Sequence, residues 1–278
     1  MEKLVKRNST FGGVFQGKRV LVTGHTGFKG SWLCEWLLSL GADVTGFSLA
    51  PSTEPALFDQ LGLGERVAHN VDDVRDLDAL RRVVDECSPE FVFHMAAQPL
   101  VLLSYDQPVE TYATNVMGTV NVLEAVRRHE RGSTCTVVAV TTDKCYENKE
   151  WVHSYREEDP MGGHDPYSSS KGAAELVVSA YRRSYFSGPG SRVNLVSARA
   201  GNVIGGGDWA PNRIVPDCMR ALSEGKRISV RNKTATRPWQ HVLEPLSGYM
   251  WLAACLSRPE FSRYPDKLLG SFNFGPSL

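Results

Sequence analysis

Charge imbalance, long apolar runs and an apolar N-terminal stretch are all lacking in this sequence of 278 residues. Its 31 Lys and Arg residues balance its 31 Asp and Glu residues, so bulk electrostatics favours neither nucleic acid nor an anionic membrane as a partner. No apolar run approaches the length of a membrane span, and residues 1–17 lack the apolar core of a signal peptide. These absences predict a cytoplasmic globular protein that works without nucleic acid or a membrane.

Cysteine is sparse, and its spacing argues against disulfide bonds. The chain holds 6 cysteines, and no two of them form a Cys-x-x-Cys pair. Reduced, structural thiols are therefore expected in place of disulfide bonds or a zinc site. The histidines show no metal-ligand spacing either, so the sequence predicts no bound metal.

What the sequence does contain is an alternation of short apolar runs and helical patterns. Apolar runs predict buried strands at residues 19–23, 43–47, 91–94, 136–141 and 193–197. Apolar residues at helical spacing predict helices at residues 31–40, 77–86, 109–129, 167–185 and 244–256. This alternation indicates an α/β fold with a doubly wound parallel sheet of Rossmann-like form.

The pattern divides the chain into a large domain and a smaller C-terminal lobe. Residues 1–200 are expected to form the dinucleotide-binding domain, with residues 240–256 returning to it as a helix. Residues 201–239 and 257–278, where the pattern loosens, are expected to form the substrate-binding lobe. The chain ends with a strand and turn at residues 271–278, which leaves open whether this lobe is truncated.

A glycine-rich turn follows the first predicted strand and opens the first predicted helix. Gly24, Gly27 and Gly30 let the backbone approach a pyrophosphate closely, and the helix start supplies free N–H groups. The first gap between these glycines is one residue longer than in the standard dinucleotide fingerprint. Cofactor binding is favoured over a purely structural turn. The other residues of the turn expected to contact the cofactor are Thr26, Phe28 and Lys29.

Two further segments are expected to contact the cofactor. Residues 73–76 carry a carboxylate that can accept the adenine amino group, and residues 94–98 offer small side chains against which a flat ring can lie. The residues assigned to this role are Asp73, Val74, Ala96, Ala97 and Gln98, with ordinary loop chemistry as the alternative. The second strand ends without the acidic residue that would hold the ribose 2′-hydroxyl of NAD. It also ends without an arginine that would bind the 2′-phosphate of NADP, and NAD is only slightly preferred to NADP.

Tyr167 and Lys171 are the main candidates for the chemistry. Residues four apart lie on one face of a helix, so Lys171 should stabilise the phenolate and lower a pKa near ~10 by about 1–3 units. Thr142 ends a predicted strand, where such sheets bind their ligands. Asp143 and Lys144 add a second acid/base pair that a simple dehydrogenase does not need. The alternative for Tyr167 and Lys171 is an ordinary surface pair.

Three short motifs resemble the extended short-chain dehydrogenase/reductase family: TGHTGFKG at residues 23–30, YSSSK at 167–171 and RAGN at 199–202. Three longer segments are most similar to the CDP-glucose 4,6-dehydratases within it: TTDKCYEN at 141–148, GGGDWAPNRIVPD at 205–217 and RNKTATRPWQHVLEPLSG at 231–248. The resemblance covers about residues 14–278. The short motifs identify only the superfamily, whereas the longer segments are far more specific.

This resemblance implies a hydro-lyase that converts the nucleotide sugar CDP-glucose to CDP-4-dehydro-6-deoxyglucose with NAD bound throughout. Thr142 would hold the hydroxyl on carbon 4 while Tyr167 removes its proton and hydride passes to NAD. Asp143 would protonate the hydroxyl that leaves carbon 6, and Lys144 would help to remove the proton from carbon 5. Related sugar-nucleotide dehydratases usually carry Glu in place of Lys144, so orienting the substrate or neutralising charge is its alternative role.

Contacts with the substrate are expected from the second lobe. Guanidinium groups suit a diphosphate because they form paired hydrogen bonds. The residues assigned to the substrate are Asn202, Arg213, Arg231 and Arg237, with plain surface charge as the alternative. The helices at residues 109–129 and 167–185 are expected to form a four-helix homodimer interface, as in the family.

Two other functions stay open. A sugar-nucleotide epimerase needs the Tyr–Lys pair but has little use for charged residues after Thr142, so Asp143 and Lys144 favour a dehydratase. A catalytically idle NAD-binding protein is the second alternative, and the end of the chain at Leu278 motivates it because relatives generally continue with further substrate-lobe structure. Residue chemistry does not distinguish cytidine from other nucleosides.

Overall fold

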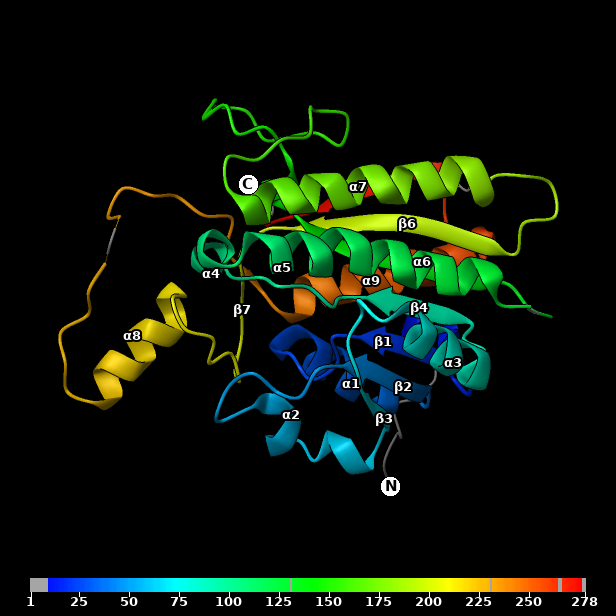
Figure 1. Cartoon of the computed structure of the whole chain (residues 1–278), viewed down its shortest axis with the longest axis horizontal. Helices are drawn as coiled ribbons and strands as arrows, with labels where there is room; N and C mark the ends of the chain where they lie inside the picture. Colours follow the sequence, from blue (N-terminus) through cyan, green and yellow to red (C-terminus); the bar gives the residue numbers. More distant parts are fainter. Residues whose placement is uncertain (1–9, 131, 231, 265–266, 277–278) are drawn as a thin grey trace, which may run out of the picture.

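The computed structural model describes residues 10–130, 132–230, 232–264 and 267–276. Its centre is a seven-stranded sheet in the order β3-β2-β1-β4-β5-β6-β9, in which all neighbouring strands are parallel (Figure 1). The strands are β1 (Arg19–Thr23), β2 (Asp43–Ser48), β3 (Ala68–Val71), β4 (Phe91–His94), β5 (Cys135–Thr142), β6 (Val193–Ala200) and β9 (Ser271–Phe274). The predicted α/β fold with a parallel, Rossmann-like sheet is confirmed.

Helices cover both faces of this sheet. One face is covered by α1 (Phe28–Ser39) and α9 (Leu243–Ser257), and the other by α3 (Leu77–Cys87), α6 (Gly118–Arg128) and α7 (Pro166–Tyr185). Alternate residues of a strand face the two cores: Val20 and Val22 pack into the first, and Leu21 into the second. Burial on both faces explains why the central strands read as nearly continuous apolar runs.

The remaining elements are short. They are the helices α2 (Leu57–Gln60), α4 (Val101–Asp106), α5 (Pro108–Tyr112) and α8 (Ile214–Ser223), the single turns η1 (Thr10–Gly13), η2 (Leu63–Glu65), η3 (Ala113–Met117), η4 (Asp143–Cys145) and η5 (Pro259–Phe261), and the paired strands β7 (Val203–Ile204) and β8 (Gln240–His241). The helix predicted at residues 109–129 runs through α5, a π-helical turn at η3 and α6. Across the described part of the chain, every helix is too short or too polar to cross a membrane.

The C-terminal part differs from the prediction in two respects. Residues 257–278 are predicted to lie in the substrate-binding lobe, but Ser271–Phe274 form β9 at the edge of the central sheet, because they pair with β6. Residues 201–239, where no helix is predicted, include α8, which stands away from the sheet on long connections (Figure 1). The rest of the predicted domain division stays a prediction.

Candidate active site

The predicted functional residues gather at the carboxyl edge of the sheet. Because the central strands are parallel, the glycine turn after β1, the loop after β4 and Thr142 at the end of β5 share this edge. Ligands of doubly wound sheets bind there. Asp165 caps α7 by accepting a hydrogen bond from Ser168 N at 2.9 Å, which places Tyr167 in the first turn of that helix.

Tyr167 lies next to Thr142 and Asp143. The pKa of Tyr167 responds both to the Thr142 side chain and to the charge of Asp143, so both side chains lie near its hydroxyl. Thr142 Oγ1 donates a hydrogen bond to Asp143 Oδ1 at 2.9 Å, so one small ligand can contact all three side chains. Lys144 belongs to the same turn, and its backbone N–H donates to Thr142 Oγ1 at 3.4 Å. Whether Lys144 acts as a base or as a charge stays a prediction.

Burial controls the acid–base state of this cluster. It raises the pKa of Tyr167 to about 12, against hydrogen bonding with Thr142, while Asp143 adds to the rise. Burial also lowers the pKa of Lys171 to about 8, against the attraction of Glu175. The predicted net lowering of the Tyr167 pKa is therefore wrong, because the loss of water around the phenol outweighs the nearby positive charge of Arg213.

The glycine turn packs tightly against the loop after β4. Gly24 has a φ of 75°, and a Cβ atom there would lie 2.8 Å from the Cα atom of Ala96. A Cβ atom at Gly30 would lie 2.1 Å from the carbonyl oxygen of Gly24. Both positions therefore require glycine. The result is a close backbone cradle at the start of α1, of the kind that accepts a pyrophosphate.

Lys29 brings a largely buried cation to this cradle. Its Nζ donates a hydrogen bond to the Tyr249 hydroxyl at 3.1 Å and lies 5.1 Å from the centre of that ring. Burial lowers the pKa of Lys29 to about 7, and the charges of Lys171 and Arg213 lower it further. The positive charges of Lys171 and Arg213 thus both act on Lys29, and an anionic ligand beside Lys29 would offset this repulsion.

The depressed pKa of Lys29 makes the free energy of unfolding depend on pH. Lys29 loses its proton near pH 7 in the folded chain, but holds it up to about pH 10.5 in the unfolded chain. Between these pH values the unfolded state therefore binds more protons than the folded state. The free energy of unfolding consequently rises with pH over this range. Relative to Lys29→Met, the wild type should therefore gain up to about 1.4 kcal/mol per pH unit above pH 7. Urea unfolding without added nucleotide, at a series of pH values, measures this gain.

The exposed Lys233 supplies the control for this measurement. The stability difference between wild type and Lys233→Met should stay constant over the same pH range. If the difference between wild type and Lys29→Met stays equally constant, the Lys29 ammonium group is not desolvated in the folded chain.

Several other residues predicted to bind the cofactor make local contacts that order the loops. Asp73 forms an ion pair with Arg75 at 2.6 Å, which lowers the pKa of its carboxyl group. Val74 packs against Gly118, where an added Cβ atom would lie 2.8 Å from Val74 Cγ2. The Gln98 side chain turns back on its own loop, where its oxygen accepts a hydrogen bond from Leu100 N at 2.5 Å. These contacts fix the loops after β3 and β4 at the carboxyl edge of the sheet.

The remaining predicted cofactor residues extend the cradle on its other sides. Thr26 Oγ1 donates to the carbonyl oxygen of Leu49 at 2.8 Å, which ties the glycine turn to the end of β2. The Phe28 ring approaches the loop after β7, where a Cβ atom at Gly205 would lie 3.1 Å from its Cζ atom. Ala97 lies in the loop after β4, beside the close approach of Ala96 to the turn.

Arg213 is the predicted substrate residue that reaches the centre. It forms an ion pair with Asp208 at 3.0 Å. Its positive charge also lowers the pKa of both Tyr167 and Lys29, so the guanidinium group lies close to both the phenol and the cradle. Arg213 can therefore contact an anionic ligand that spans them.

Of the other predicted substrate residues, Asn202 follows Gly201, where an added Cβ atom would lie 3.4 Å from Asp143 Oδ2. The Asn202 carbonyl oxygen accepts a hydrogen bond from Gln240 N at 3.0 Å, which joins the loop after β6 to β8. Arg237 is exposed and donates to the carbonyl oxygen of Thr236. Arg231 lies outside the described residues. Within the described ranges, no group of three or more His, Cys, Asp or Glu side chains is arranged to hold a metal ion.

Glu175 is a residue near the site that the sequence analysis missed. It is 3% exposed and lies four residues beyond Lys171 and eight beyond Tyr167, so the three share one helix face. Its carboxylate raises the pKa of Lys171. An acidic residue on the buried face of a helix that already carries a Tyr–Lys pair is the signal that would have identified it.

Sequence comparisons connect the chain with sugar-nucleotide enzymes. Residues 21–261 match the family described as GDP-mannose 4,6 dehydratase. CDP-glucose 4,6-dehydratase of Salmonella typhimurium is 53% identical over 265 residues, which make up 94% of this chain and 72% of that protein. CDP-paratose 2-epimerase of Salmonella typhi is 31% identical over 211 residues, 69% of this chain and 59% of that protein.

Solved structures of such enzymes share the fold. DesIV, a dTDP-glucose 4,6-dehydratase from Streptomyces venezuelae solved with NAD bound, is similar with a TM-score of 0.76 and 25% identity, over 94% of this chain and 76% of that chain. UDP-glucose 4-epimerase from Thermotoga maritima is similar with a TM-score of 0.75 and 21% identity, over 92% of this chain and 76% of that chain. One fold thus serves dehydratases and epimerases, so the reaction has to be argued from the site.

Proposed function

The chain belongs to the GDP-mannose 4,6 dehydratase family, and we propose that it is a hydro-lyase that converts CDP-glucose to CDP-4-dehydro-6-deoxyglucose with NAD bound throughout. The observation that carries this proposal is the meeting of Thr142, Asp143 and Tyr167 beside the glycine turn. Oxidation of a hydroxyl needs the threonine and the phenol, whereas loss of water also needs an acid. The choice of CDP-glucose rests on the 53% identical relative.

The residues at the carboxyl edge fit NAD. Gly24 and Gly30 allow a pyrophosphate to approach the backbone, and Lys29 supplies positive charge beside them. NAD held there would supply the acceptor for hydride from carbon 4 and the donor of hydride to carbon 6, and its positive charge would favour the phenolate of Tyr167. Lys171 lies four residues beyond Tyr167 on the same helix face and adds a further positive charge.

The protein's own side chains move the protons. Thr142 holds the hydroxyl on carbon 4, and Tyr167 takes its proton. The ketone at carbon 4 makes the hydrogen on carbon 5 acidic, and we assign to Lys144 both the removal of that proton and its return to carbon 5 when hydride is added to carbon 6. Asp143 donates a proton to the hydroxyl that leaves carbon 6. Each general acid–base step of this kind contributes about 10²–10⁴-fold to the rate.

The substrate's diphosphate and nucleoside extend toward the C-terminal lobe in this proposal. Arg213 binds the diphosphate, since its charge already acts on Tyr167 and Lys29. A hollow of about 400 Å³ beside α8, lined in part by Lys226 and Arg227, accepts the nucleoside end. Asn202, Arg231 and Arg237 stay predicted contacts of the same ligand.

We further propose that the chain forms a homodimer through the helices beside the site. α5 and α7 pack together, and together with η3 they expose apolar side chains, among them Val109 (74% exposed), Met117 (51%) and Leu176 (63%) (Figure 1). A second copy would cover these side chains. The cytoplasmic location stays an expectation from the sequence.

Incubation of the purified protein with NAD and CDP-glucose tests the proposed reaction. We expect a 4-keto sugar, detected by its absorbance in alkali, to form faster from CDP-glucose than from GDP-mannose or UDP-glucose. An epimerase would instead return a hexose of changed configuration without a 4-keto product. An idle protein would bind NAD and release neither product, and either of these outcomes would contradict the proposal.

A further inference from the structure

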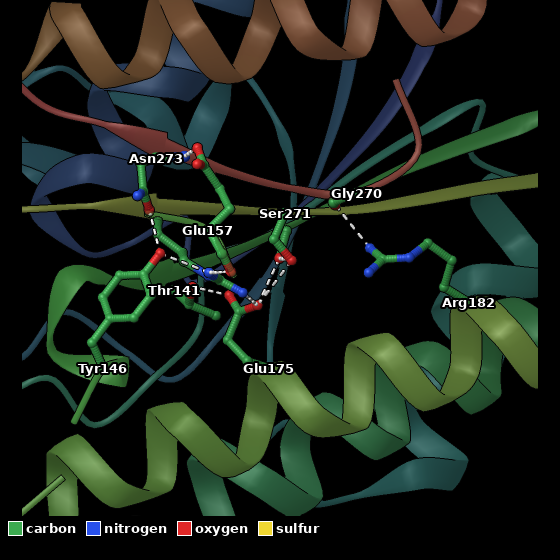
Figure 2. A network of polar contacts seen from close by, with 10 residues as sticks. Thr141, Tyr146, Glu157, Glu175, Arg182, Gly270, Ser271 and Asn273 are labelled. Atoms are coloured by element: carbon green, nitrogen blue, oxygen red, sulfur yellow. Dashed lines mark hydrogen bonds and ion pairs between the residues drawn. The ribbon is translucent and has the colours of Figure 1, made fainter. Parts of the chain in front are cut away.

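A buried ion pair contacts the two residues that flank the segment carrying Thr142 and Asp143, and Figure 2 shows the polar network around its Glu175. Arg199 of β6 donates from Nη2 to Glu175 Oε2 of α7 at 2.7 Å, and the two side chains are 4% and 2% exposed. A buried pair of this kind contributes little net stability, because removing two charges from water costs about as much as their attraction returns. A role in fixing geometry therefore explains its presence better than a role in stability.

The pair holds the catalytic segment, residues 142–145, at both ends. Thr141, the residue before this segment, donates its hydroxyl hydrogen to Glu175 Oε1. Tyr146, the residue after it, accepts a hydrogen bond from Arg199 Nη1 at 2.7 Å. Figure 2 shows both side chains pointing toward the ion pair from opposite ends of the segment. One ion pair thus fixes the entry and the exit of the turn that carries Asp143.

The same pair connects this segment with the helix that carries Tyr167. Glu175 lies about two helical turns beyond Tyr167 on the same face, with Lys171 between them. Distances along a helix are fixed by its geometry, so a contact at Glu175 also sets the position of residues 142–145 relative to the Tyr167 hydroxyl. Glu175 is itself held by Ser271 of β9, whose hydroxyl donates to Oε2 at 3.3 Å.

We propose that Glu175 and Arg199 are positioning residues that hold the catalytic segment at the separation from Tyr167 that the reaction requires. The inference rests on the proposed dehydratase activity, in which Asp143 and Tyr167 act in turn on one hexose. A displacement of about 1 Å is enough to cost about 10²-fold in rate. The contacts of Thr141 and Tyr146 with the pair should therefore affect kcat much more than folding.

Two variants release the segment and leave the ion pair in place: Thr141→Val and Tyr146→Phe. Each is expected to lower kcat for CDP-glucose about 10-fold to 100-fold, with KM and NAD affinity changed less than about threefold. Thr141→Ser keeps the hydroxyl and should stay within about threefold of the wild-type kcat. Ser271→Ala is the matched control, because it removes a contact with Glu175 that does not involve the segment. Thermal unfolding shows that each variant is folded.

Equal kcat values for Thr141→Val and Ser271→Ala, or for Thr141→Val and Thr141→Ser, would overturn the proposal. If the wild type makes no 4-keto sugar, the proposed function fails and kcat cannot test the positioning role. The position of residues 142–145 in a crystal structure of the variants then tests it. A crystal structure of Thr141→Val combined with Tyr146→Phe should show residues 142–145 displaced relative to α7. If the double variant does not fold, the Thr141→Val structure serves instead. An unmoved segment overturns the role in either case.

Discussion

Replacing Tyr167 by phenylalanine is expected to lower kcat for CDP-glucose by about 10²–10⁴-fold, because the proton of the carbon-4 hydroxyl then loses its acceptor. The phenylalanine ring has the shape of the tyrosine ring, so the buried packing at the start of α7 is retained. Binding of NAD and CDP-glucose should persist. Initial rates of 4-keto sugar formation measure the loss, and titration of bound NAD shows that the pocket is intact.

Tyr185→Phe is the matched control for this variant. Tyr185 lies at the other end of the same helix and is 55% exposed, so its hydroxyl is remote from the proposed chemistry. This variant should keep wild-type kcat. A Tyr167→Phe enzyme that retained more than about a tenth of the wild-type kcat would show that another group takes the proton.

The central strands could be predicted because burial on both faces leaves continuous apolar runs. Residues 19–23 and 91–94 match β1 and β4 at both ends, and residues 136–141 lie inside β5. β3 escaped prediction because its four residues, AHNV, are partly polar and largely exposed. The position of β9 in the sheet depends on pairing with β6, a contact between distant segments that no local pattern encodes.

The reacting residues could be predicted for a similar reason. Helical spacing pairs Tyr167 with Lys171, and the end of a buried strand marks Thr142 as a position beside a ligand. The support for these residues is tertiary: Glu175 of α7 meets Arg199 of β6 across the core. The pKa of Tyr167 was predicted in the wrong direction because the degree of burial, which outweighs charge there, is also a property of the folded chain.

Asp143→Asn is expected to separate the two halves of the reaction. The amide keeps an oxygen that can accept the hydrogen bond from Thr142 Oγ1, which is 2.9 Å long in the structure. Oxidation at carbon 4 should therefore continue. An amide cannot protonate the hydroxyl that leaves carbon 6, so loss of water should slow by about 10²–10⁴-fold. Reduced nicotinamide should accumulate transiently after mixing with CDP-glucose.

Rapid mixing measures both steps together: the absorbance of reduced nicotinamide follows the oxidation, and quenched samples follow the 4-keto product. Asp106→Asn, on the exposed side of α4, is the control and should behave as the wild type. The hydrogen bond between Thr142 and Asp143 makes the result decisive, because its geometry survives the substitution while the acidic proton does not. If oxidation and loss of water slowed equally, no reduced nicotinamide would accumulate, and Asp143 would act by orienting Thr142.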